Sequence, residues 1–183
     1  MRPRGQHLAA FAASLVLLFG CRTADDSSVK RATSAPLPMF GVVLPASEAP
    51  HLLAACDGKT ASADSLWSPP DSTLKALEVR LAQHLISISR TDSLQAYSRQ
   101  YLGLYRGGRK LIFVKGVHRS YLTGAVAQDS AAGISRSESV ARVQQWLRTS
   151  AVRVCDGGMA FFRAEYDVTV DRIAYFSFNA YES

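Results

Sequence analysis

Two of the four histidines stand where a general base could act. His84 lies within a segment of helical apolar spacing, and His118 follows a segment of β-type residues. Imidazole is the side chain that most often transfers protons near neutral pH, and Ser120 and Asp156 could complete a nucleophile, base and acid set with His84. No GxSxG or HExxH motif fixes any of these residues. A small periplasmic hydrolase that uses His84 or His118 is therefore one hypothesis, and the sequence assigns no catalytic residue.

The segment Ser72-Thr73-Leu74-Lys75 carries another possible nucleophile. Its spacing is similar to the SxxK element of penicillin-interacting serine enzymes, where the lysine lies one helical turn from the serine. Members of that family also carry SDN-type and KTG-type elements. This chain has neither, since Lys59-Thr60 is followed by Ala61. A serine at a helix start, followed by an exposed lysine, explains the segment without catalysis.

Cys21 follows a segment with the layout of an export signal. Arg2 and Arg4 make the amino terminus positive, and residues 8–19 are uncharged and largely apolar. A helix of that length reaches about 18 Å, which is short of the roughly 30 Å hydrocarbon core of a bilayer. Residues 1–20 are therefore expected to be a cleaved signal peptide.

The sequence Leu18-Phe19-Gly20-Cys21 resembles the lipobox of bacterial lipoproteins. In that family the cysteine receives diacylglycerol, with acyl chains such as palmitate, and the chain is cut just before it. Phe19 departs from the usual small residue, and an ordinary secretory cleavage site beside Cys21 is the alternative. The resemblance implies a cell-envelope protein anchored to a membrane by lipid on Cys21. Because Arg22 replaces the aspartate that favours inner-membrane retention, it also implies the outer membrane, facing the periplasm.

Cys56 and Cys155 remain as an even pair if Cys21 carries lipid. Disulfides persist in an oxidising compartment, so we expect these two cysteines to be bonded to each other. The loop would span about 100 residues, for which the chain-entropy model assigns about 4–5 kcal/mol. The alternative is a zinc site with two of His51, His84 and His118. Close CxxC or HxxxH spacing is absent, so we expect neither a metal nor another cofactor.

Alternate positions of one β-type segment carry aromatic and cationic residues, namely Tyr97, Arg99, Tyr101 and Tyr105. Alternation places all of them on one side of a strand, where they could contact a sugar or a protein partner. One face of a sheet packed on a helix would show the same pattern. Asp156, in Cys155-Asp156-Gly157-Gly158, could likewise meet a ligand, or the glycines could serve a disulfide-pinned bulge. These five residues are the candidate ligand or partner face.

Composition limits the classes of partner. The formal charge of +6 falls to +4 without residues 1–20, which hold two arginines and no acid. The arginines are scattered and the expected compartment holds no nucleic acid, so nucleic-acid binding is disfavoured. Residues 21–38 are polar, charged and free of aromatics, which predicts a flexible tether that reaches about 20–25 Å. Residues 39–183 have a length suited to a single globular domain.

Helical signals are clearest in two places. Leucines at helical spacing predict a helix after Pro70, with Asp71 or Ser72 as its cap. The spacing of Ser135 and Glu138 is that of a capping box and predicts a second, shorter helix. The small and polar residues 120–133 between them are expected to form a loop.

Strand signals surround these helices. Gly107-Gly108 between segments 97–106 and 109–117 predicts a β-hairpin. Further strands are expected at 152–155, 159–166 and 173–179, and residues 167–171 are expected to form the loop of a second hairpin. The fold class is therefore α+β, with an N-terminal helix followed by an antiparallel sheet of hairpins and a second short helix. With a strong anchor and no defined catalytic set, the leading hypothesis is a non-enzymatic module that binds an envelope protein or glycan, or assists assembly.

Overall fold

The computed structural model describes residues 41–54, 62–88 and 93–179. All of them lie in one compact unit, Pro36–Ser183. The predicted signal peptide and tether, together with Cys21 and Cys56, lie outside the described residues. Over the described ranges, no helix is both long enough and apolar enough to span a bilayer.

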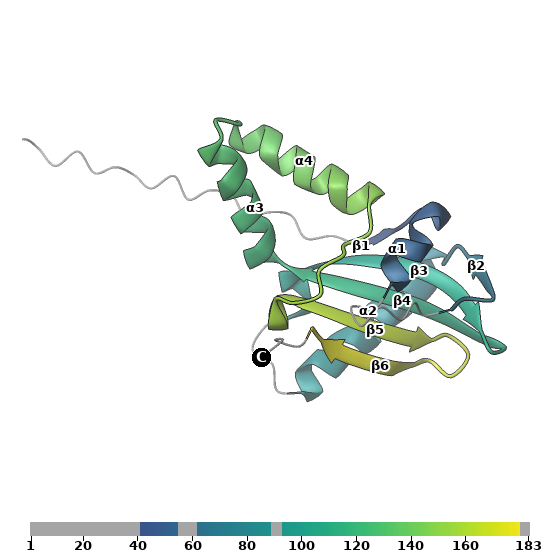
Figure 1. Cartoon of the computed structure of the whole chain (residues 1–183). Coiled ribbons are helices and arrows are strands. Elements are labelled where there is room, and N and C mark those ends of the chain that lie inside the picture. Colours follow the sequence, from purple (N-terminus) through teal and green to yellow (C-terminus); the bar gives the residue numbers. More distant parts are fainter. Residues whose placement is uncertain (1–40, 55–61, 89–92, 180–183) are drawn as a thin grey trace, which may run out of the picture. The chain divides into compact units, whose positions relative to one another are not determined.

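Six strands form one mixed sheet in the order β1-β3-β4-β5-β6, with β2 also paired to β3 (Figure 1). The strands are β1 (Gly41–Val43), β2 (Ser65–Trp67), β3 (Tyr97–Arg106), β4 (Arg109–His118), β5 (Phe161–Asp167) and β6 (Arg172–Phe178). Only the pairing of β1 with β3 is parallel among the described strands. The helices are α1 (Ala49–Leu53), α2 (Asp71–Ser87), α3 (Arg119–Ala131) and α4 (Arg136–Thr149). The predicted α+β class is confirmed.

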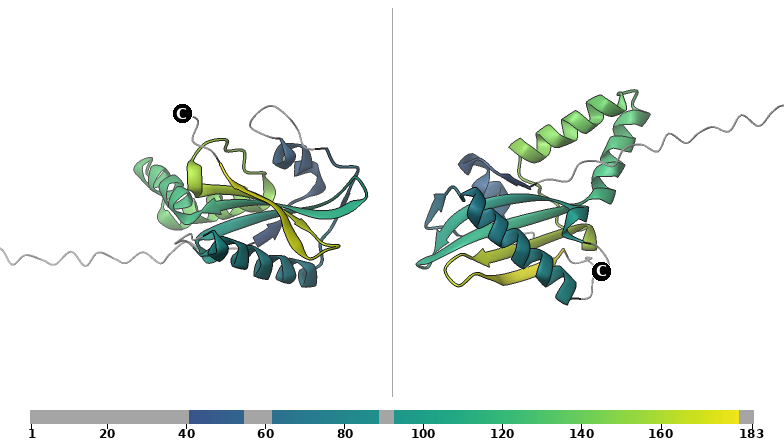
Figure 2. Two further views of the ribbon diagram at one scale, coloured as in Figure 1. Left: turned by 90° about the horizontal axis from the view of Figure 1, so that it is seen from below. Right: turned by 180° about the vertical axis from the view of Figure 1, so that it is seen from behind.

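One face of the sheet is covered by α2 (Figure 2). Leu77, Leu81 and Leu85 are at most 2% exposed and pack on the strands, which confirms the predicted apolar stripe. The helix begins after Pro70 without a side-chain cap, so the expected cap by Asp71 or Ser72 is wrong. Asp71 is instead the first helical residue, where its charge favours the helix dipole.

The opposite face is divided between two clusters. Leu52 and Leu53 of α1 pack on Leu102 and Leu111 of β3 and β4. The helical pair α3 and α4 packs over one end of the sheet, where its apolar residues surround Phe161. Figure 2 shows α1 and this pair on the side of the sheet away from α2.

The expected loop at 120–133 is wrong, because most of it is helix α3. His118 caps the helix by accepting a hydrogen bond from the Ser120 amide at 3.2 Å. Leu122 and Val126, one turn apart, are the buried residues of the helix. Two large apolar side chains give too weak a periodic signal to predict a helix from the sequence. The helix is stabilised by its burial against α4 and β4.

Both predicted hairpins are confirmed. Gly107 and Gly108 join β3 to β4 with φ values of 55° and 73°, a left-handed pair that glycine adopts without a Cβ clash. Asp171 has φ 48° in the turn between β5 and β6. The predicted helix after Ser135 is α4, and the Ser135 hydroxyl accepts from the Glu138 amide at 3.3 Å, which is the N-cap half of a capping box. The Glu138 carboxylate pairs with Arg142.

The strand expected at 152–155 is wrong. Residues 150–157 form an irregular segment, here called the crossing loop, that runs over the sheet face opposite α2. Side chains satisfy its backbone in place of a neighbouring strand. The Gln100 side-chain oxygen Oε1 accepts from the Val152 backbone amide at 2.9 Å, and the Asn179 side-chain nitrogen Nδ2 donates to the Val154 carbonyl at 2.6 Å. A buried glutamine and a single asparagine thus hold the loop on β3 and β6.

Candidate functional site

The aromatic stripe of β3 lies in the core. Tyr97 and Tyr101 are 1% and 3% exposed and face α2, and Tyr105 packs beside Trp67 with ring centroids 6.4 Å apart. Arg99 forms an ion pair with Glu78 of α2, with an Nη2 to Oε2 distance of 2.6 Å. The prediction that the four side chains share one side is confirmed. Tyr97 and Tyr101 are buried, and Arg99 and Tyr105 are half-buried against Glu78 and Trp67, so the four side chains do not form an open ligand face.

His84 borders an open cavity of about 330 Å³ between α2 and the start of β6. Its ring packs on Phe176, with centroids 4.9 Å apart. Arg80 and Asp171, which are ion-paired, also line the cavity. Hydrogen bonds from Arg80 and then from Tyr166 lower the pKa of Asp171 to about 2. This ion pair attaches the β5–β6 turn to α2, so Arg80 and Asp171 have a structural role.

The possible catalytic set of Ser120, His84 and Asp156 is not joined by hydrogen bonds in the described part of the chain. The Ser120 hydroxyl instead lies 2.8 Å from His118 Nδ1, at the start of α3. That contact places a serine beside a histidine, within the capping geometry of the helix. The exposed Asp156 uses its backbone carbonyl to accept from Asn179 at 3.2 Å.

Cys155 lies in the crossing loop and is disulfide-bonded. It is the only cysteine among the residues that the structure describes, since Cys21 and Cys56 lie outside them. The identity of its partner therefore stays a prediction, with Cys56 as the expected residue. The loop position agrees with the idea that glycines beside the cysteine relieve backbone strain, because Gly157 has φ 91°.

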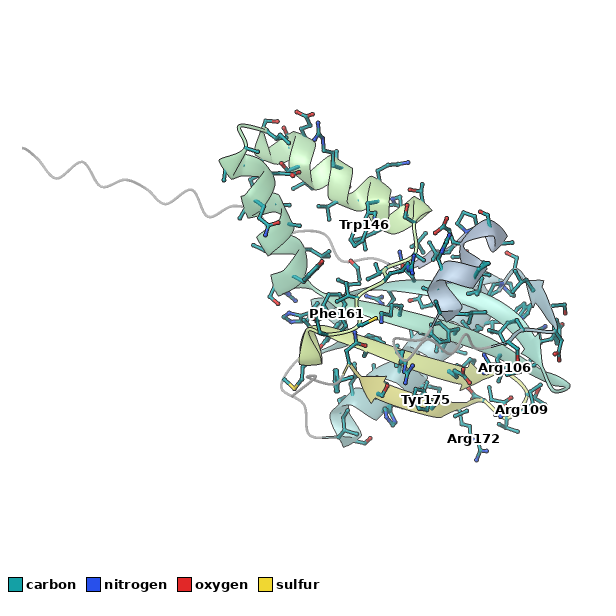
Figure 3. The ribbon with its side chains drawn as sticks, in the orientation of Figure 1. Arg106, Arg109, Trp146, Phe161, Arg172 and Tyr175 are labelled. Carbon is teal, nitrogen blue, oxygen red and sulfur yellow. The ribbon has the colours of Figure 1, made fainter. Side chains whose placement is uncertain are left out.

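A polar surface lies beside the crossing loop, with side chains from the strands β3, β4, β5 and β6. Phe162, Ala164 and Tyr166 of β5 point to α2 and are buried, so Arg163 and Glu165 point to the opposite side. The strand pairing aligns these residues with neighbours on β4 and β6. We define the hairpin face as the side chains of Arg106, Lys115, Arg163, Glu165, Tyr175 and Ser177. Figure 3 shows Tyr175 on the near side of β6, with α2 behind the sheet.

Arg163 is held by hydroxyl groups at the centre of the hairpin face. Its Nε donates to the Tyr175 hydroxyl at 3.0 Å and to the Ser177 hydroxyl at 3.1 Å. The guanidinium carbon lies 5.3 Å from the Tyr175 ring centroid, within cation–π range. Within the described residues, the two terminal nitrogens of Arg163 make no hydrogen bond and no ion pair. The two terminal nitrogens therefore keep unused hydrogen-bond donors on a half-buried side chain.

Lys115 is the cross-strand neighbour of Arg163 and is only 7% exposed. Its ammonium donates to the Val154 carbonyl at 3.2 Å and to the Asn179 side-chain oxygen at 3.4 Å. Both contacts are longer than the roughly 2.7–2.9 Å of charge-assisted hydrogen bonds. Burial, followed by the charge of Arg163, lowers the pKa of Lys115 to about 8. The lysine is a buried cation whose partners in the described structure are neutral.

The remaining charges of the hairpin face are Arg106 and Glu165, which form an ion pair at 2.7 Å. Arg106 Nη2 is buried, and it has no hydrogen-bond partner in the described structure. The face therefore holds the three cations Arg106, Lys115 and Arg163 against the one carboxylate of Glu165. Its formal charge is positive, and the excess lies on Lys115 and Arg163.

Sequence reasoning missed this surface. Arg163 and Glu165 alternate with buried apolar residues, and that pattern does reveal one polar side of a strand. Lys115 directly follows the apolar run Ile112-Phe113-Val114 within the same predicted strand, which was a second signal of this polar surface. Asn179, which contacts both Lys115 and the crossing loop, had no local signal because its partners are more than twenty residues away.

The donor set gives no metal site, since no group of three or more His, Cys, Asp or Glu residues gathers within the described ranges. Comparison with known proteins gives no further assignment. No protein-family model, curated protein or solved structure matches the chain.

Proposed function

We propose that the chain is a lipid-anchored cell-envelope protein that binds another envelope component through the hairpin face and catalyses no reaction. The observation that carries the binding role is the neighbouring pair Lys115 and Arg163, a buried cation beside an incompletely bonded one. Such a pair costs stability, because charges leave water without a carboxylate to compensate them. Perturbed ionisable groups of this kind cluster at functional sites.

The anchoring role is supported by the lipobox resemblance at Cys21. Two acyl chains suffice for stable membrane attachment, whereas one chain binds only marginally. Arg22 favours the outer membrane, with the globular part in the periplasm. Replacing Cys21 by Ser should move the protein from the membrane fraction to the soluble periplasmic fraction. An unchanged distribution of the Cys21→Ser protein between the two fractions would refute the anchor.

The binding role can be tested by capture of envelope components with the full-length protein. Arg163→Ala and Tyr175→Ala should each lose a component that the unaltered protein retains, because both remove parts of the hairpin face. Arg172→Ala is the matched control: it removes a positive charge from the same hairpin, at a residue that borders the α2 cavity instead. An equal loss with Arg163→Ala and Arg172→Ala would show diffuse charge attraction and would reject the hairpin face as the binding surface.

A hydrolase is the second candidate. The contact of Ser120 with His118 favours a catalytic set built on His118 over a set built on His84. Ester and peptidoglycan substrates would be incubated with the protein and with His118→Ala, Ser120→Ala and His84→Ala variants. Turnover that disappears with His118→Ala and Ser120→Ala, and persists with His84→Ala, would support this candidate. The absence of any histidine-dependent turnover would exclude it.

A further inference from the structure

The charge balance of the hairpin face defines a gap in its interactions. Arg106 and Glu165 compensate each other, which leaves the charges of Lys115 and Arg163 without a carboxylate among the described residues. The crossing loop packed on Lys115 carries Arg153 and Asp156, both exposed, and its Val154 carbonyl accepts a hydrogen bond from the lysine. The missing counter-charge is therefore about two negative units.

The hydrogen-bond donors of the face point to the same gap. The terminal nitrogens of Arg163 have no partner in the described structure, and Arg106 Nη2 is buried without one. Hydroxyl groups of Tyr175 and Ser177 hold the Arg163 Nε in place. With Nε held, the two unbonded terminal nitrogens form the planar fork that recognises oxyanions through two parallel hydrogen bonds.

We infer that the hairpin face binds a phosphate monoester group of an envelope molecule, with Arg163 as the direct ligand and Lys115 as the charge beneath it. This inference rests on the proposed function and specifies the ligand chemistry. A phosphate monoester carries about −1.5 to −2 charge at pH 7 and three acceptor oxygens, which match the unbalanced charge and the several donors. A carboxylate carries one charge and two oxygens, so it matches the face less well.

Lys115 and Arg163 can act together because they are directly paired across β4 and β5. Directly opposed residues in antiparallel strands have Cβ atoms about 4.5–5.5 Å apart. Arg163 is half-buried and meets the ligand at the surface, whereas the more deeply buried Lys115 contributes its field through a medium that screens charge weakly. A bound dianion would remove the repulsion between the two cations.

The experiment uses the full-length protein in a non-ionic detergent and follows the arginine side-chain nitrogen signals by NMR at pH 7. Glycerol 3-phosphate, glucose 1-phosphate and acetate are titrated separately at low ionic strength. We expect saturable shifts at Arg163 with both phosphate esters and binding of acetate at least about tenfold weaker. Tighter binding of the glycerol ester would indicate a lipid head group as the source, and tighter binding of the glucose ester a phosphorylated glycan.

Variants decide whether the site is specific. Arg163→Gln should weaken phosphate-ester binding about tenfold or more, equivalent to 1.4 kcal/mol, whereas Arg172→Gln, with the same charge change on the same hairpin, should weaken it less than about twofold. Arg163→Lys keeps the charge and removes the fork, so its affinity should fall between those of the unaltered protein and Arg163→Gln. Thermal unfolding curves show whether each variant is folded, and Arg163→Lys serves as the test if Arg163→Gln is not.

Three results would overturn the inference: no saturable shift with either ester up to about 50 mM, acetate binding as tight as phosphate-ester binding, or equal weakening by Arg163→Gln and Arg172→Gln. The proposed function fails separately. If an envelope component is captured in an Arg163-dependent manner and no phosphate ester binds, the binding role stands and the ligand class is wrong. If phosphate esters bind and no envelope component is captured, the envelope partner is rejected and the phosphate site stands.

Discussion

Lys115 is the residue in which stability and the proposed role oppose each other. A lysine that is 7% exposed, with long bonds to neutral acceptors, loses hydration that its partners do not replace. Its pKa is lowered to about 8 by burial and by Arg163, against an ordinary value of 10.5. Between these two values the unfolded chain binds more protons than the folded one, so this residue makes the free energy of unfolding rise with pH.

Replacing Lys115 by Met should therefore raise the free energy of unfolding at pH 7 by about 1–3 kcal/mol. Methionine keeps most of the buried aliphatic volume and removes the charge that lost its hydration. The gain over the unaltered protein should shrink as the pH rises from 8 towards 10, where the folded lysine becomes neutral. Urea unfolding of both proteins at pH 7 and pH 10 measures this. An equal gain at the two pH values would contradict the assigned cause.

At the scale of elements, α2 is attached to the sheet by charge as well as by leucines. Arg99 of β3 donates from both Nε and Nη2 to the two carboxylate oxygens of Glu78, at 3.1 and 2.6 Å. The Tyr101 hydroxyl donates to the same carboxylate. The side chains of Arg99 and Glu78 are 12% and 29% exposed, so the pair is partly shielded from water. Glu78 thus fixes the position of α2 along β3.

Glu78→Gln should lower the free energy of unfolding by about 2–3 kcal/mol, because it leaves Arg99 as a largely buried cation without its carboxylate. Arg142→Gln is the matched control. It breaks the exposed pair with Glu138, whose side chains are 57% and 53% exposed, and should cost less than about 0.5 kcal/mol. Urea unfolding at neutral pH compares the two variants. A similar small loss for both would show that the buried pair does not hold the helix.

Two glycines test the packing of different elements, and we expect opposite signs. A Cβ at Gly116 of β4 would lie 2.0 Å from the buried Phe162 ring, so Gly116→Ala should destabilise by about 1–3 kcal/mol. A Cβ at Gly124 of α3 meets nothing within 4 Å, so Gly124→Ala should stabilise by about 0.5–1 kcal/mol through helix propensity. Thermal unfolding of both variants is the measurement. A destabilised Gly124→Ala protein would show that α3 packs more tightly than the structure indicates.

At the scale of the whole molecule, the two ends of the described chain meet on the crossing loop. Asn179, after the last strand, bonds to Val154 and Asp156, and Glu48, near the first strand, accepts from the Ala151 amide at 2.8 Å. The Gln100 side chain, from β3, donates to the Leu147 and Ser150 carbonyls at 2.8 Å each. The loop is therefore the place where α4, the sheet and the carboxyl-terminal residues are joined, and the hairpin face lies beside it.

The disulfide predicted between Cys56 and Cys155 would add a covalent link to this loop. Mass spectrometry of unreduced peptides should identify the pair Cys56 and Cys155, with Cys21 absent from it. Replacing Cys56 by Ser should then lower the free energy of unfolding by about 2–5 kcal/mol, because the unfolded chain gains a long unconstrained loop. Cys21→Ser should leave it unchanged. Recovery of a Cys21–Cys155 peptide would contradict both the pairing and the lipid assignment.

Local signals predicted the elements whose stability begins locally. The leucine stripe of α2, the Gly107-Gly108 turn and the Ser135 N-cap each act within a few residues, and each is present in the structure. Helix α3 was missed because its stability comes from contact with α4 and β4, and only Leu122 and Val126 mark it. The strand at 152–155 was wrongly expected because its apolar residues pack inward without a neighbouring strand.

The sequence by itself determined the fold class, both hairpins and the alternation of β3, and it is the basis for the expected anchor at Cys21. Only the tertiary structure decided which alternating face is open. The aromatic face of β3 is buried because α2 covers it, and the polar face of β5 and β6 lies away from that helix. Alternation along a strand distinguishes two sides and carries no information about which distant helix packs on them. The neighbouring cations Lys115 and Arg163 likewise come together through strand pairing between segments nearly fifty residues apart.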